Sequence, residues 1–194
     1  LEEKMKIDIH NYPKRMEAAL KQVSEADISR KNKKLILSFR DHCTMQGMSL
    51  ARISRYLGIL KDWALILKKD FDKATKEDLM KAVRVIQEKE NYTAWTKATY
   101  KIMLKCFFKW LKGTEEHPEI TKWIKTAIKQ NERKMISNGE LITENEVKKL
   151  VSVAEHPRDK ALISCLYESG ARIGELAGLV IGSIKIDEYG AVLN

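Results

Sequence analysis

Four lysines recur at every fourth residue in one segment, and their side chains could bind phosphate groups. They are Lys97, Lys101, Lys105 and Lys109. At 3.6 residues per turn, this spacing places the four ammonium groups along one side of a helix. Like charges at this spacing repel one another by roughly a few tenths of a kcal/mol per pair, a cost that bound phosphates would offset. We interpret the row as a cationic ridge on the outer face of a DNA-binding helix, the alternative being a solvated helix surface.

A preceding segment carries Arg52 and Arg55 on a similar amphipathic pattern. One constant offset aligns Ser49 with Thr96 and Trp63 with Trp110, and we interpret the two segments as related helices that begin at these hydroxyl caps. Coincidence between two amphipathic helices is the alternative. Two basic helices side by side could enter or straddle a major groove. We therefore expect duplex DNA to contact the following residues: Arg52, Arg55, Thr96, Lys97, Lys101, Lys105 and Lys109.

The charge of the chain supports a polyanionic partner. The 194 residues include 36 Lys and Arg against 27 Asp and Glu, a net charge of +9. Residues 1–134 hold 30 of the basic residues, whereas residues 135–194 hold six basic and nine acidic ones. This asymmetry predicts a cationic module joined to a part with a different task. A helical protein–protein adaptor with an incidental basic surface is an alternative.

Other kinds of site are not indicated. The three cysteines lie far apart and form no CxxC pair, and the spacing of the four histidines builds no metal site. No glycine-rich phosphate loop or Ser/His/Asp order is present. We expect no cofactor and no metal, and the short apolar runs predict a soluble, cytoplasmic protein without a membrane partner.

Helical periodicity dominates the chain to about residue 180. Helices are predicted over 13–24, 30–45, from Ser49 to about 67, from Thr75 to about 90, over 96–112 and over 119–132. Loss of periodicity over 131–140 predicts a linker. Thr143 and Glu146 then form a capping box.

The last part of the chain changes its period. A helix from Pro157 is expected to bury Ala161, Leu162, Cys165 and Leu166 and to end at Gly170 in a left-handed conformation, and a short helix is expected over 173–179. Alternation over 184–186 and 191–193, around turn residues 187–190, predicts a β-hairpin. The second strand is barely begun at Asn194, so we expect the sequence to be a fragment.

One stretch resembles a known catalytic motif. It reads Arg158-Asp-Lys-Ala-Leu-Ile-Ser-Cys-Leu-Tyr-Glu-Ser-Gly-Ala-Arg172-Ile-Gly-Glu175-Leu-Ala-Gly-Leu179. It resembles the first catalytic box of the tyrosine recombinase (phage integrase) family, usually written RD-x-A-L-x-x-L-x-x-T-G-x-R-x-x-E-L-x-x-L, with Ser169 in place of the frequent Thr. Upstream, the segments Thr-x-x-x-Tyr, Phe-Phe-Lys-Trp-Leu and Leu-Ile-Thr-Glu-Asn-Glu-Val also resemble that family. The resemblance covers most of residues 30–194.

The resemblance implies that Arg172 is a catalytic arginine and that Glu175 supports it. A guanidinium presents a planar fork of donors that matches phosphate oxygens, and a prepositioned cation stabilises the charge that builds up during phosphoryl transfer. We expect flanking apolar residues to hold Arg172 rigidly just after the helix stop at Gly170. Glu175 is placed to orient the guanidinium. An ordinary surface Arg–Glu pair is the alternative.

Other parts of the family machinery are not found in this sequence. In the family, a tyrosine attacks DNA to form a 3′-phosphotyrosyl link, assisted by a hairpin lysine and a His-x-x-Arg motif, without metal or nucleotide. No histidine here is followed by Arg at the third position, and no tyrosine has the family's position. We therefore expect binding of double-stranded DNA without cleavage, whereas the full-length enzyme would act as a homo-oligomer on DNA.

The predicted fold class is mainly α. A helical, SAM-like core-binding bundle over 28–134 follows an N-terminal helical extension over 1–27. Residues 135–194 would form the truncated N-terminal part of an α+β catalytic domain with an incipient β-hairpin. The alternative function is a naturally short DNA-binding or regulatory module that is never catalytic.

Overall fold

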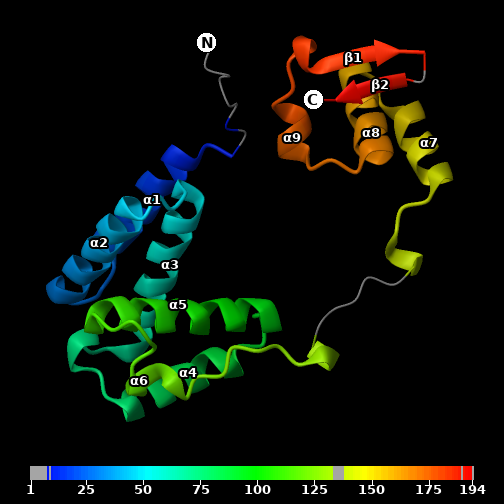
Figure 1. Ribbon diagram of the computed structural model, residues 1–194. Helices are drawn as coiled ribbons and strands as arrows, with labels where there is room; N and C mark the ends of the chain where they lie inside the picture. Colours follow the sequence, from blue (N-terminus) through cyan, green and yellow to red (C-terminus); the bar gives the residue numbers. More distant parts are fainter. Residues whose placement is uncertain (1–7, 9, 133–137, 189, 194) are drawn as a thin grey trace. The chain divides into compact units, whose positions relative to one another are not determined.

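The computed structural model describes residues 8, 10–132, 138–188 and 190–193, and it is mainly helical (Figure 1). The contacts between residues divide the described chain into two compact units. The first unit contains the helices α1 to α6, and the second contains the helices α7 to α9 and a two-stranded sheet. The fold class predicted from the sequence is therefore confirmed as mainly α. Each unit is described by itself.

The first unit is a bundle of helices with short connections. Its elements are α1 (Tyr12–Glu25), α2 (Arg30–Met45), α3 (Leu50–Leu67), the 3₁₀ turn η1 (Phe71–Lys73), α4 (Lys76–Glu88), α5 (Ala94–Lys112), α6 (Glu119–Lys122) and η2 (Gln130–Glu132). α1 packs along α3, and α3 also contacts α2, α4 and α5. Gly113 ends α5 at a φ of 62°, the left-handed conformation that suits glycine.

Aromatic side chains form the centre of this unit. The indole Nε1 of Trp63 on α3 donates a hydrogen bond of 3.0 Å to the carbonyl of Tyr100 on α5. The ring of Phe71 meets that of Phe107 edge-on with centroids 4.7 Å apart, and Phe39 meets Phe107 at 5.4 Å. The rings join α2 and η1 to α5, and the bond of Trp63 joins α3 to α5. Together these contacts fix the position of α5 against α3.

Two helix predictions in this unit are wrong. α5 begins at Ala94 and is capped by Thr93, whose hydroxyl accepts a hydrogen bond of 3.2 Å from the amide of Thr96. Thr96 therefore lies in the first turn, and its proposed equivalence to the N-cap Ser49 does not hold. The earlier Thr93 takes the cap because its side chain reaches the free amide at the third helical position.

The helix expected over 119–132 ends at Lys122. Ile124 is buried in the core, and its carbonyl accepts a hydrogen bond of 3.3 Å from Nζ of Lys105. That carbonyl would accept from the amide of residue 128 in a continued helix. A tertiary contact thus replaces the helical bond, and the chain continues beside α5 in irregular conformation to η2. Part of the predicted linker, residues 133–137, lies outside the described residues.

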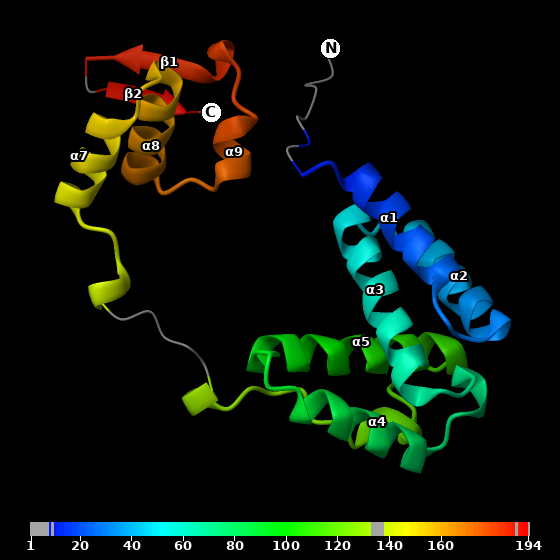
Figure 2. The ribbon, with the colours of Figure 1, turned by 180° about the vertical axis from the view of Figure 1, so that it is seen from behind.

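The second unit follows the sequence pattern in its element order. Its elements are η3 (Asn138–Glu140), α7 (Glu144–Val153), α8 (Pro157–Ser169), α9 (Ile173–Ala177), η4 (Ile181–Ser183), β1 (Ile184–Asp187) and β2 (Gly190–Leu193). α7 and α8 lie side by side (Figure 2), and β1 pairs antiparallel with β2. The capping box of Thr143 with Glu146 and the left-handed Gly170, with a φ of 62°, are both confirmed.

The interior of the second unit is small. Among its described residues, Val147 and Ser183 are the buried ones. The prediction that α8 buries four apolar residues is wrong, because Ala161 and Cys165 are exposed and Leu162 and Leu166 are half-buried. α8 packs mainly against α7 and α9. In the part of the chain that the structure describes, no helix is both long and apolar enough to cross a membrane.

Candidate nucleic-acid interface

The four lysines of the predicted ridge differ in exposure. Lys109 is exposed, Lys97 and Lys105 are half-buried, and the side chain of Lys101 is only 8 % exposed. The expectation of a continuous outer face is therefore wrong at Lys101. The irregular segment after α6 lies beside this part of α5 and covers it, a contact between residues far apart in the sequence.

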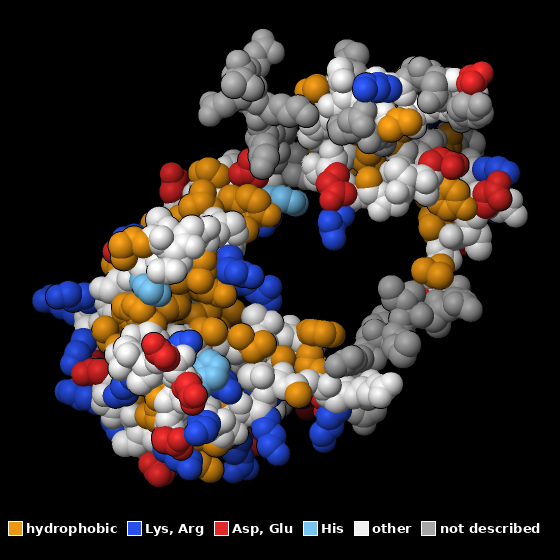
Figure 3. Space-filling model, in the orientation of Figure 1, with side chains coloured by type: hydrophobic (Ala, Val, Ile, Leu, Met, Phe, Trp, Pro, Cys, Tyr) orange, Lys and Arg blue, Asp and Glu red, His pale blue; other side chains and the backbone are white. Residues whose placement is uncertain are grey.

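Cations from α3 and α5 gather around Cys106. Burial raises the pKa of the Cys106 thiol, and the nearby positive charges of Lys109, Lys105 and Arg52 oppose that rise. Arg52 and Lys109 are exposed, as is Arg55 one turn further along α3. The structure thus brings Arg52 of α3 near Lys105 and Lys109 of α5, and the visible face of the first unit carries many Lys and Arg side chains (Figure 3).

Thr96 and Lys97 lie at the beginning of α5 and are held by local partners. The hydroxyl of Thr96 is 2.9 Å from that of Thr93. Nζ of Lys97 donates a hydrogen bond of 2.7 Å to the carbonyl of Gln87 at the end of α4. These two residues therefore stand apart from the cations around Cys106, at the opposite end of the lysine row.

Arg172 is the N-cap residue of α9. Its amide donates a hydrogen bond of 2.7 Å to Oε2 of Glu175, and its Nη1 donates one of 3.0 Å to Oε1. The hydrogen bond from the Arg172 amide is the largest cause that lowers the pKa of Glu175, followed by the bond from the guanidinium. Glu175 thus orients Arg172 through both backbone and side chain.

The apolar support expected for Arg172 is not found. The neighbouring Ile173 is 45 % exposed, and the Arg172 side chain is 87 % exposed. Ser169 shapes the preceding turn instead, since its hydroxyl donates to the carbonyl of Cys165 at 2.5 Å and accepts from the amide of Ala171 at 3.2 Å. Polar contacts within the turn therefore take the place of the predicted apolar packing.

Most donors of the Arg172 guanidinium remain available to an incoming anion. Glu175 occupies one of its five N–H groups, and a phosphate can accept two parallel hydrogen bonds from the others. Among the described residues, no three His, Cys, Asp or Glu side chains are grouped so that they could hold a metal ion. The site is therefore an exposed guanidinium that a carboxylate orients.

A comparison with curated proteins supports part of the family resemblance. A segment of 47 residues is 45 % identical to the tyrosine recombinase XerA of Pyrococcus horikoshii. The match covers 24 % of this chain and 16 % of that recombinase. The chain is thus similar to a tyrosine recombinase over about a quarter of its length. No protein-family model and no solved structure matches the chain.

Proposed function

We propose that this chain is the N-terminal part of a site-specific tyrosine recombinase and that it binds duplex DNA without cleaving it. The observation that carries the proposal is the convergence of Arg52, Lys105 and Lys109 from two helices around Cys106. Cations on two neighbouring helices can each neutralise a phosphate of the same duplex. Arg55 extends this surface along α3. Because Lys101 is buried, and Thr96 and Lys97 lie at the opposite end of the lysine row from Cys106, we place these three outside the direct contact.

The second unit would supply the first catalytic arginine of the enzyme. Arg172 would bind the scissile phosphate, and Glu175 would act as its positioning residue. The complete enzyme, acting as a homo-oligomer on DNA, would form and resolve a 3′-phosphotyrosyl link without a cofactor. The partial match to a tyrosine recombinase supports this assignment.

The exposed apolar side chains of the second unit also support the proposal. Large apolar residues exposed there include Leu141, Ile142, Leu150, Val153, Val180, Ile184 and Val192. Among the residues described in this unit, only Val147 and Ser183 are buried. Such a surface is expected for a portion of a larger catalytic domain whose remaining elements would pack against it.

Charge reversal tests the DNA interface. The double variant Lys105→Glu, Lys109→Glu should weaken binding to a duplex by roughly tenfold or more at 0.1 M salt, because it removes two phosphate contacts. The matched control is Lys34→Glu, Lys81→Glu, which changes the net charge equally at exposed residues of α2 and α4. Fluorescence anisotropy measures both affinities. If both variants lost the same duplex affinity, the effect would come from net charge alone, and the proposed interface would be wrong.

A covalent trapping assay tests the claim that the chain does not cleave DNA. A nicked suicide substrate releases a short strand after cleavage and traps the phosphotyrosyl link, so that an active recombinase remains attached to DNA. We expect no adduct from this chain on gels that retain covalent complexes. A tyrosine-linked adduct would show that one of its own tyrosines acts as the nucleophile, and the proposal would then be wrong.

A further inference from the structure

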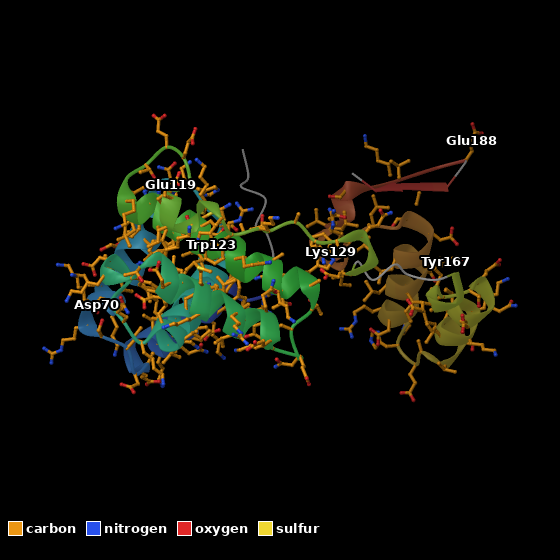
Figure 4. The ribbon with its side chains drawn as sticks, turned by 90° about the horizontal axis from the view of Figure 1, so that it is seen from below. Asp70, Glu119, Trp123, Lys129, Tyr167 and Glu188 are labelled. Carbon is orange, nitrogen blue, oxygen red and sulfur yellow. The ribbon has the colours of Figure 1, made fainter. Side chains whose placement is uncertain are left out.

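A cavity of about 700 Å³ lies between α5, the end of α4 and the segment that follows α6. Its polar lining consists of Gln87, Lys97, Lys101, Lys125, Lys129 and Glu132. Small apolar side chains, among them Ala98 and Ile128, complete the wall. Figure 4 shows the irregular segment that runs from Trp123 to Lys129 beside α5. The volume falls within the range of about 300–1,000 Å³ that small-molecule sites occupy.

The charges around this cavity are not balanced. Four lysines face one carboxylate, that of Glu132. Lys101 is the most enclosed of them, since the residue is only 8 % exposed, and it forms part of the cavity wall. Burial is the main cause that lowers the pKa of Lys101; Glu132 opposes this effect and Lys97 adds to it.

Four ammonium groups around one cavity repel one another, and an anion between them would relieve that repulsion. Lys97 and Lys101 lie one turn apart on α5, and Lys125 and Lys129 approach from the covering segment. Cations on two sides of a cavity can each contact different oxygens of a compact polyanion. The tetrahedral oxygens of phosphate groups suit several ammonium donors at once.

We propose that this cavity binds a small molecule carrying two or more phosphate groups, with Lys101 as the central contact. The site differs from the proposed DNA interface, which lies around Cys106 and consists of Arg52, Arg55, Lys105 and Lys109. A duplex presents its phosphates on a wide surface, and a side chain that is 8 % exposed beneath a covering segment is out of reach of that surface. A free polyphosphate can enter the cavity.

Calorimetric titration of the whole chain with inorganic tripolyphosphate tests this site. The wild type should bind, and Lys101→Met should bind at least tenfold more weakly because it keeps the aliphatic stem but removes the charge. The matched control is Lys112→Met, at the exposed end of the same helix, which should bind as the wild type does. Absence of wild-type binding up to millimolar concentrations, or unchanged binding by Lys101→Met, would overturn the proposal.

Two further measurements keep the test decisive. Lys129→Gln changes an exposed residue of the covering segment, and it should also weaken tripolyphosphate binding even if Lys101→Met fails to fold. Duplex affinity of Lys101→Met, or of Lys129→Gln in its place, should equal that of the wild type. If tripolyphosphate and duplex affinities fall together, the cavity serves a DNA phosphate and the small-molecule proposal is wrong. If only the variant Lys105→Glu, Lys109→Glu loses duplex binding while it still binds tripolyphosphate, the two sites are separate, as proposed.

Discussion

Asn32 is a buried polar side chain that joins α2 to the turn after α3. Its Nδ2 donates a hydrogen bond of 3.0 Å to the carbonyl of Lys69, and its Oδ1 accepts one of 2.9 Å from the amide of Phe71. Through these bonds it holds Phe71 against the aromatic core. A single residue of α2 thereby fixes the loop that leads to α4.

Replacing Asn32 tests the contribution of these bonds. We expect Asn32→Leu to lower the free energy of unfolding by about 2–4 kcal/mol, because the amide of the buried Phe71 and the carbonyl of Lys69 both lose their partner. Urea unfolding followed by circular dichroism measures the change. Asn91→Leu is the control, because Asn91 is exposed in the loop before α5. A loss below about 0.5 kcal/mol for Asn32→Leu would show that water satisfies both groups.

Asp78 connects local charge to stability at low pH. Its Oδ2 accepts hydrogen bonds from Nζ of Lys69 at 2.7 Å and from the amide of Thr75 at 2.9 Å. The bond to Lys69 is the largest cause that lowers the pKa of Asp78 from 3.8 to about 2. The folded state thus binds this proton more weakly than the unfolded chain does, so the carboxylate stabilises the fold above about pH 4 and stops doing so as the pH falls through 2.

The pH dependence of a variant checks this sign. Asp78→Asn should lower the melting temperature relative to wild type at pH 7, and the difference should shrink as the pH falls from about 4 towards 2. Thermal unfolding at several pH values gives the difference directly. Asp27→Asn, in the exposed loop between α1 and α2, is the control. A difference that stays constant between pH 7 and pH 2.5 would contradict the assignment.

Glycines at two places in the helices have opposite roles. Gly113 follows α5 with a φ of 62°, whereas Gly58 lies inside α3, and at both places a Cβ would meet no atom within 4 Å. Steric crowding is therefore not a factor at either site. Only the backbone conformation separates them.

This pair gives a prediction for the elements. Gly113→Ala should destabilise the fold by about 1 kcal/mol, because alanine is strained in the left-handed conformation. Gly58→Ala should stabilise it by about 0.5–1 kcal/mol, because alanine favours the helix and restricts the unfolded chain. Chemical unfolding of both variants supplies the two values. Changes of the same sign would contradict the helix end at Gly113.

The sequence pattern predicted most helices and strands, but it did not predict the tertiary contacts that end or bury some of them. Thr143, Glu146 and Gly170 mark helix ends through bonds or backbone angles that depend only on near neighbours, so they were readable from the sequence. The early end of α6 was not, because it depends on the contact of Lys105 with the carbonyl of Ile124. The N-cap of α5 was also mispredicted, because Thr93 and Thr96 are both threonines that could cap the helix and the structure uses Thr93.

In the candidate sites, too, local contacts could be predicted from the sequence and tertiary contacts could not. The contact between Arg172 and Glu175 could be predicted from the sequence, since their spacing of three residues fits a capping box at the start of a helix. The burial of Lys101 was missed because the segment that covers it lies more than twenty residues further along the chain. Lys125 and Lys129 were not singled out for the same reason. A period-of-four lysine row gave the only signal, and that signal indicated an exposed surface.

At the scale of the whole molecule, the two units differ in both charge and core. The first unit carries most of the basic residues and a large aromatic core, whereas the second is acidic and has little interior. A basic, well-packed unit is suited to bind a polyanion without help from the other. The central claim is therefore that exposed cations of α3 and α5 bind the phosphates of duplex DNA.

The salt dependence of duplex binding by the whole chain tests this claim most directly. Contacts by Arg52, Arg55, Lys105 and Lys109 with four phosphates predict that the logarithm of the association constant falls against the logarithm of salt concentration with a slope of about −3 to −4. The variant Lys105→Glu, Lys109→Glu should flatten this slope by about 2. A wild-type slope near zero, or no measurable duplex binding at low salt, would contradict the claim.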